Sequence, residues 1–271
     1  MAKKSKRRKQ RAVTSGITSQ AGRYFDLLQQ HVVQGNYTEA VAVGQRLLDV
    51  LPPRSQMRVD TLLQIGISQA MLQNFSQSYE AFTEALDINP NDAEAWYNRG
   101  MASRYTSRIG RSLRDYQRAK ELNTHPELNK RIDKEVEFAE KMVRSSLKLR
   151  GPNFTLDQLI EQEDHFQRGL EAMQAGRWQE AEEAFRASIA MGDVLPQPWG
   201  NLGLSLMMQK RYDEAEEALR HALKIDPKYA VAKNNLKMMP EIRRSGPPDI
   251  FGITEPFRTA NPKQSITFVK E

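Results

Sequence analysis

Residues 196–229, PQPWGNLGLSLMMQKRYDEAEEALRHALKIDPKY, decide the fold of this chain. Large, small and glycine residues follow one another there in a fixed order: Trp199, Leu202, Gly203, Ala215, Leu219, Ala222 and Pro227. A glycine at the eighth position lets two helices approach closely, and the small residue twelve positions later faces the same contact. A larger side chain would overpack this contact at a cost of about 1–3 kcal/mol. Because Pro227 ends a helix and redirects the chain, the segment predicts a pair of closely packed helices.

The same order of residues recurs upstream at a spacing of 34 positions. The preceding copy contains His165, Arg168, Gly169, Ala181, Phe185 and Ser188. Two further copies align Leu62, Gly66, Ser78, Phe82 and Ala85 with Trp96, Gly100, Ser112, Tyr116 and Ala119. A weaker copy near the start has Tyr24, Leu27, Leu28, Ala40, Leu47 and Pro52. A fixed period of this length is typical of a stacked array of helix pairs.

These motifs resemble the tetratricopeptide-repeat family, which pairs a Trp–Leu–Gly–Tyr helix with an Ala–Phe–Ala–Pro helix. The resemblance covers about residues 21–125 and 162–236. It implies an all-α fold, a right-handed superhelix of tetratricopeptide helix-turn-helix repeats. We expect repeats at about 21–54, 59–92 and 93–126 in an N-terminal block, and at about 162–195 and 196–229 in a C-terminal block. The first repeat departs from the pattern, with Leu28 in place of glycine.

Between the blocks the repeat pattern stops, but one apolar stripe continues at helical spacing. It consists of Leu128, Ile132, Val136, Ala139, Met142, Val143 and Leu147. We expect a helix here that caps the N-terminal block, which then extends over 21–150, because stacked repeats need polar end caps. Gly151, Pro152 and Asn153 break this helix, and Thr155 with Gln158 predicts a capping box at the start of the next. The C-terminal block is expected over 155–243 with a terminal helix, and an extended proline-containing tail over 244–271.

Composition narrows the class of function. With 39% hydrophobic and 27% charged residues, the chain suits a soluble helical protein, and no stretch approaches the length of a membrane-spanning helix. The absence of cysteine excludes disulfides, thiol catalysis and thiolate metal sites. The four histidines, His31, His125, His165 and His221, lack metal-ligand spacing, and no phosphate-binding or nucleophile motif is present. We expect a cytoplasmic protein that is not an enzyme and has no cofactor, metal or small-molecule substrate.

In the tetratricopeptide family, the first helix of each repeat turns its second, fifth, sixth, ninth, twelfth and thirteenth positions toward an inner groove. The sixth position here carries Asp26 and then a series of carboxamides: Gln64, Asn98, Gln167, Asn201 and, in the terminal helix, Asn235. Carboxamides both donate and accept hydrogen bonds, so a ladder of them can bind the backbone of an extended peptide. The alternative is that each amide bonds only a neighbouring helix.

Apolar side chains surround these amides in the expected groove, and methionine adapts its shape to varied partners. The candidate contacts are Tyr97, Met101, Phe166, Leu204, Met207 and Met208. The alternative is that some of them only pack between repeats. The prediction is a protein-interaction adaptor or scaffold that holds a peptide or partner protein in this groove, with no bond made or broken.

The basic residues gather at the N-terminus: Lys3, Lys4, Lys6, Arg7, Arg8, Lys9 and Arg11. Subtracting these seven charges from the net charge of +6 leaves about −1 for the rest of the chain. Residues 1–20 are expected to form a disordered, solvated tail. Two other interpretations are contact with RNA, a ribosome or DNA through phosphates, and a nuclear import signal if the source is eukaryotic. An RNA- or ribosome-associated factor is therefore the alternative function.

Overall fold

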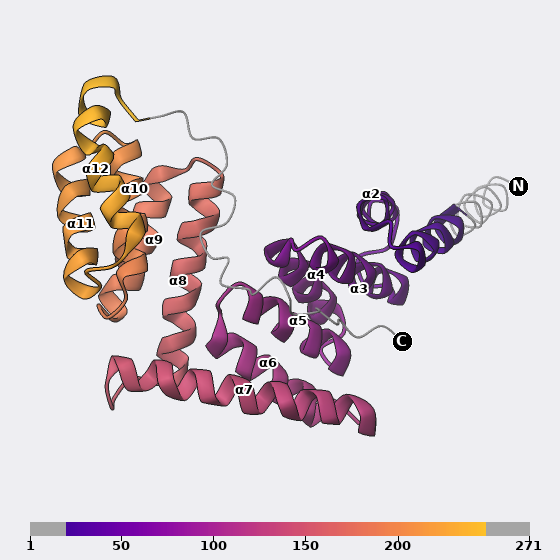
Figure 1. Ribbon diagram of the computed structural model, residues 1–271. Helices are drawn as coiled ribbons and strands as arrows, with labels where there is room; N and C mark the ends of the chain where they lie inside the picture. Colours follow the sequence, from indigo (N-terminus) through magenta and orange to yellow (C-terminus); the bar gives the residue numbers. More distant parts are fainter. Residues whose placement is uncertain (1–19, 248–271) are drawn as a thin grey trace, which may run out of the picture. The chain divides into compact units, whose positions relative to one another are not determined.

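The computed structural model describes residues 20–247, and every regular element in that range is an α-helix (Figure 1). Residues 20–34 are helical. The helices that follow are α2 (Tyr37–Leu48), α3 (Gln56–Met71), α4 (Phe75–Ile88), α5 (Ala93–Tyr105), α6 (Ile109–Leu122), α7 (Pro126–Arg150), α8 (Leu156–Gln174), α9 (Trp178–Met191), α10 (Pro196–Met208), α11 (Tyr212–Ile225) and α12 (Ala230–Ser245). None of these described helices combines the length and apolarity needed to cross a membrane. The predicted all-α architecture of tetratricopeptide helix pairs is confirmed.

Close contact between paired helices occurs at the glycine of the eighth position. A Cβ atom added to Gly66 of α3 would lie 2.8 Å from the ring of Phe82 in α4. One added to Gly169 of α8 would lie 2.5 Å from the ring of Phe185 in α9. Gly100 meets Tyr116, and Gly203 meets Leu219, in the same way. These separations are shorter than a carbon–carbon contact, so the pairs pack closely because the position carries no side chain.

The described residues divide into two compact units, and the division falls inside α7. The first unit contains residues 20–106 and 111–138, and the second contains 107–110 and 139–247. The sequence pattern put the division at 151–154, where the helix does end. The difference arises because the apolar stripe of α7 continues: Leu128 and Ile132 are buried in its first half, and Ala139 and Val143 in its second. One helix therefore supplies a packed face to each unit.

The first unit contains a buried ion pair between α5 and α6. Arg99 Nε lies 2.9 Å from Asp115 Oδ2, and Arg99 Nη2 lies 2.7 Å from Asp115 Oδ1. The residues are 8% and 1% exposed, and the guanidinium carbon lies 4.4 Å from the ring centroid of Trp96. Burial opposes the charge of Arg99, but the hydrogen bonds and charge of Asp115 outweigh it and raise the pKa of the guanidinium. Removal of Asp115 would leave the buried guanidinium of Arg99 without its carboxylate partner.

The second unit begins its repeats with the predicted capping box. The Thr155 hydroxyl accepts a hydrogen bond from the Gln158 backbone N–H at 3.2 Å, and Gln158 Oε1 accepts one from the Thr155 N–H at 2.9 Å. This prediction is confirmed. The chain reverses before it at Gly151, whose φ of +106° favours glycine. One apolar core then runs from α8 to α12, with Phe185, Leu206 and Leu219 fully buried in it.

Candidate protein-interaction surface

The predicted amide ladder is divided between the two units. Gln64 on α3 and Asn98 on α5 belong to the first unit, and Gln167 on α8, Asn201 on α10 and Asn235 on α12 to the second. Asn98, Gln167 and Asn201 are buried, at 2%, 7% and 6% exposure, whereas Gln64 and Asn235 are half-buried. The three amides of the second unit lie at equivalent places on successive inner helices, because they are 34 residues apart.

Asn201 has an unused hydrogen-bond donor. Its Nδ2 atom is buried and has no hydrogen-bond partner among residues 20–247. The Oε1 atom of Gln197, one helical turn earlier on α10, is buried and unpaired in the same sense, as is Oε1 of Gln64. Gln167 differs, since its Nε2 donates to Glu171 Oε1 at 3.1 Å. A buried polar group without a hydrogen-bond partner lowers the stability of the fold by about 1–3 kcal/mol. The side-chain amides of Asn201 and Gln197 on α10 are therefore candidates for binding a ligand or each other.

The predicted apolar contacts of the first unit are buried within it. Tyr97 and Met101 are 3% and 4% exposed. The ring of Tyr97 packs 5.7 Å from that of Tyr116, whose hydroxyl donates to the sulfur of Met101 at 3.1 Å. Burial, followed by the charge of Glu135, raises the pKa of Tyr97 to about 12. Glu135 lies on α7 and pairs with Arg104 of α5 at 3.0 Å, so the first half of α7 packs over this part of α5.

The second unit leaves more of the predicted contacts accessible. Phe166 on α8 and Leu204 and Met208 on α10 are half-buried, whereas Met207 is 2% exposed. Phe166 and Leu204 pack against the core of the unit with part of their surface. Helical spacing places Leu204 and Met208 on one face of α10, next to Asn201. We call Phe166, Asn201, Leu204, Met208 and Asn235 the inner face.

A polar contact that sequence reasoning missed joins the α9–α10 loop to α11. Asp193 accepts a hydrogen bond from Trp199 Nε1 with one oxygen, and its other oxygen lies 2.9 Å from His221 Nε2. The rings of Trp199 and His221 stack with their centroids 4.0 Å apart. Asp193 stands at the position where three other repeats have Pro52, Pro90 and Pro227, and that departure was the available signal. In the described part of the chain, no group of three histidine or acidic side chains could hold a metal ion.

Two cavities of the second unit lie away from the inner face. One is lined by α8 and α9, the other by α9, α10 and α11, and each has a volume of about 470 Å³. Their linings repeat at 34 residues: Glu180, Glu183 and Ala184 in the first correspond to Glu214, Glu217 and Ala218 in the second. The predicted groove residues line neither of these two cavities.

Comparison with known protein families supports this description of the repeats. Tetratricopeptide-repeat models match residues 81–121, from α4 to α6, and residues 166–230, from α8 to the start of α12. The chain contains tetratricopeptide repeats in these two stretches. Repeats of this family serve in general as protein-interaction scaffolds.

Individual relatives match over short stretches. Superkiller protein 3 of Saccharomyces cerevisiae is 26% identical over 98 residues, which are 35% of this chain and 7% of that protein. Protein SGT1 homolog of Bos taurus is 35% identical over 71 residues, 26% of this chain and 20% of that protein. Among solved structures, MamA is 18% identical with a TM-score of 0.35, covering 78% of this chain and 93% of its own. The P58(IPK) TPR domain is 13% identical with a TM-score of 0.46, covering 83% and 66%.

Proposed function

We propose that this scaffold holds an extended segment of a partner protein on the inner face of its second unit. The observation that carries the proposal is the buried, unpaired Nδ2 atom of Asn201, which lies beside apolar side chains that keep accessible surface. A backbone carbonyl of the bound segment would accept the hydrogen bond from Asn201. Because Nδ2 is covered in the free chain, the amide must rotate outward as the segment binds.

The apolar side chains of the inner face supply the second part of the interaction. Phe166, Leu204 and Met208 are half-buried, so a bound side chain removes their remaining apolar surface from water. Each buried Å² contributes about 25 cal/mol before the cost of ordering the segment. Asn235 is half-buried on α12 and offers a further donor and acceptor. Contacts of this kind bind a segment by its backbone and by apolar side chains, with no charge requirement.

The competing explanation for the unpaired amide is internal. Gln197 Oε1 is an unpaired acceptor one turn away on the same helix, and a change of rotamer would let it accept from Asn201. Asn201 would then stabilise α10 without contacting a ligand. The two explanations differ in what Asn201→Ala changes: partner binding in the first case, and the free energy of unfolding alone in the second.

Site-directed photo-crosslinking in the native lysate tests the proposal. A photoreactive residue at position 208 should capture a partner, whereas one at position 224, exposed on α11, should not capture the same protein. Asn201→Ala should reduce capture at 208 with thermal unfolding preserved, and Asn234→Ala, the same change at an exposed position of α12, should have no effect. Equal capture at 208 and 224, or capture that Asn201→Ala leaves unchanged, would refute the inner face as the binding surface.

A second candidate function rests on the basic residues Lys3 to Arg11, which lie outside the described residues. Seven positive charges without an acid among them favour phosphate contacts, with binding that weakens steeply as salt rises. We propose RNA or a ribosome as the alternative partner. Deletion of residues 1–12 should abolish that association, and nuclease should release it. Partners that survive both treatments belong to the repeats instead.

A further inference from the structure

In the second unit, charged pairs join each outer helix to the next repeat. Glu182 of α9 pairs with Arg211, the residue that precedes α11, and accepts a hydrogen bond from Gln209 Nε2 at 3.0 Å. Arg186, one turn further along α9, pairs with Glu214 of α11 at 3.5 Å. Glu182 is only 8% exposed. A glutamate and an arginine four residues apart on α9 therefore dock onto an arginine and a glutamate of the following repeat.

We call Arg211 and Glu214, which accept the contacts of α9, the receiving pair. The preceding repeat carries an equivalent pair 34 residues earlier. Arg177 corresponds to Arg211, and Glu180 to Glu214. Arg177 and Glu180 are 3.4 Å apart, as Arg211 and Glu214 are at 2.6 Å. The side chains of Arg177 and Glu180 are 55% and 62% exposed, compared with 39% and 47% for their counterparts. An equivalent of the receiving pair is thus present at the first helix pair of this unit and is more open to solvent there.

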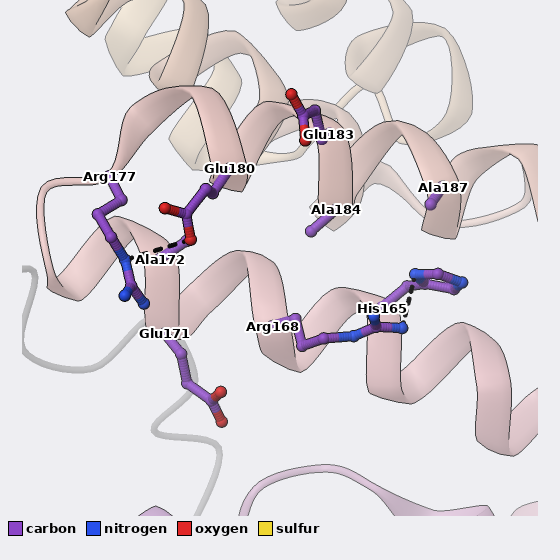
Figure 2. A pocket seen from close by; sticks show the side chains of 9 residues that line it. All are labelled: His165, Arg168, Glu171, Ala172, Arg177, Glu180, Glu183, Ala184 and Ala187. Carbon is purple, nitrogen blue, oxygen red and sulfur yellow. Dashed lines mark hydrogen bonds and ion pairs between the residues drawn. The ribbon is translucent and has the colours of Figure 1, made fainter.

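The first of the two cavities lies beside this pair, between α8 and α9 (Figure 2). Three alanines line it, Ala172, Ala184 and Ala187, and charged side chains surround them. Short side chains let another helix approach closely. At the equivalent cavity of the next repeat, α9 itself contributes Arg186 to the lining. A neighbouring helix therefore borders the later cavity, whereas the cavity between α8 and α9 is lined only by its own repeat.

Two further positions distinguish the two cavities. Trp199 and Leu202 of the later repeat are replaced by His165 and Arg168 in the earlier one. Arg168 Nη2 lies 2.9 Å from His165 Nδ1, and the pair forms a polar rim of the cavity (Figure 2). Burial, and then the charge of Arg168, lowers the pKa of His165. A polar rim can be solvated when the face is free, which suits a partner that associates reversibly.

We propose that this face, the open edge (Arg177, Glu180 and the three alanines), docks an amphipathic helix of a partner protein. The helix carries a glutamate that pairs with Arg177 and, four residues later, an arginine that pairs with Glu180. Its chemistry is that of α9, whose Glu182 and Arg186 make these pairs with Arg211 and Glu214. The open edge is separate from the inner face, so a scaffold with both surfaces holds an extended segment and a helix together.

The probe for this proposal is a labelled synthetic copy of α9, residues 178–191. A lactam bridge between peptide positions 180 and 184 keeps it helical, because so short a helix is marginal in water. Helical spacing places both positions on the face of the peptide opposite Glu182 and Arg186. We expect fluorescence anisotropy to show saturable binding to the full chain. Arg177→Glu should weaken binding by about five- to tenfold, since an attraction becomes a repulsion. A peptide with Glu182→Arg should restore affinity for the Arg177→Glu chain.

Control variants separate docking from general charge effects. Lys228→Glu makes the same charge change at an exposed turn before α12, and it should leave the affinity unchanged. Asn201→Ala should also leave it unchanged, so failure of the inner-face proposal would not affect this one. The proposal is overturned if the full chain does not bind the peptide, if Lys228→Glu weakens binding as much as Arg177→Glu, or if the swapped charges give no recovery. Binding that appears only after deletion of residues 248–271 would also overturn it, because the occupant would then be this chain's own segment.

Discussion

Replacement of Gly169 by alanine is expected to destabilise the second unit, although alanine is the better helix former. In a helix interior the change should gain about 1 kcal/mol from backbone propensity. The new Cβ would lie 2.5 Å from one ring carbon of Phe185 and 2.7 Å from another. Ordinary contact needs at least 3.4 Å, so the ring must move by roughly 1 Å, and Phe185 is 0% exposed. Overpacking of so enclosed a ring belongs at the upper part of the range of about 1–3 kcal/mol. The net loss should be about 1–2 kcal/mol.

Urea denaturation measures this loss. Trp178 and Trp199 both lie in the second unit and Trp96 in the first, so fluorescence in a Trp96→Phe background reports the second unit. Gly22→Ala is the matched control, because no atom lies within 4 Å of the Cβ that it adds to a helical residue. Followed by circular dichroism, it should stabilise the first unit by up to about 1 kcal/mol. A Gly169→Ala chain at least as stable as the parent, beside a Gly22→Ala chain that behaves as expected, would refute close packing as the reason for glycine.

Three further changes test other contacts. Asp115→Ala should lower the unfolding free energy of the first unit by about 3–5 kcal/mol in urea denaturation, because the buried guanidinium of Arg99 loses its carboxylate partner. Adding Arg99→Met should recover most of this loss. A loss below about 1 kcal/mol would contradict a buried ion pair. Burial favours protonation of Glu182, but hydrogen bonds from Gln209 and a neighbouring arginine outweigh it and lower the pKa of this carboxyl. Its contribution is therefore complete above the unfolded pKa of about 4.3 and is lost as pH falls through the lower folded value. Glu182→Gln should flatten the acid unfolding curve of the second unit, and an unchanged curve would count against the pairing. Thr155→Ala should cost about 1 kcal/mol in urea denaturation and Thr155→Ser much less; equal losses would mean that the hydroxyl does not cap α8.

The sequence predicted the elements that depend on local pattern. The glycine at the eighth position predicted a close approach of the two helices in a repeat, and the structure contains this approach at Gly66 and Gly169. The side chain that meets each glycine is the ring 16 residues later, whereas the sequence pattern had placed the small residue 12 positions later at that contact. The Thr155 capping box was predicted for the same reason, since its two hydrogen bonds join residues three apart. Such features are encoded within one repeat, so a single sequence is enough to find them.

The burial of the predicted groove residues depends on which helix packs against them. The repeat period does not predict the position of such a helix. Tyr97 and Met101 occupy positions that face a groove in the family, but α7 packs over α5 through the Arg104–Glu135 pair. α7 lies outside the repeat pattern, so its contact with α5 could not be read from the repeat period. In the second unit, α10 and α12 recur at the 34-residue spacing of the repeats. Leu204 on α10 is only half-buried there. Their role in binding stays a prediction.

The distribution of methionine gives this protein an internal record of oxidation. Its sulfur resides in 11 methionines, since it has no cysteine. Met71 and Met238 are 39% and 47% exposed, whereas Met101 and Met207 are 4% and 2% exposed. An oxidant that reacts with the folded chain should convert the exposed thioethers first, and a sulfoxide at Met207 requires prior opening of the core. The order in which these sulfoxides form, followed by mass spectrometry, therefore reports which helices open before the whole chain unfolds.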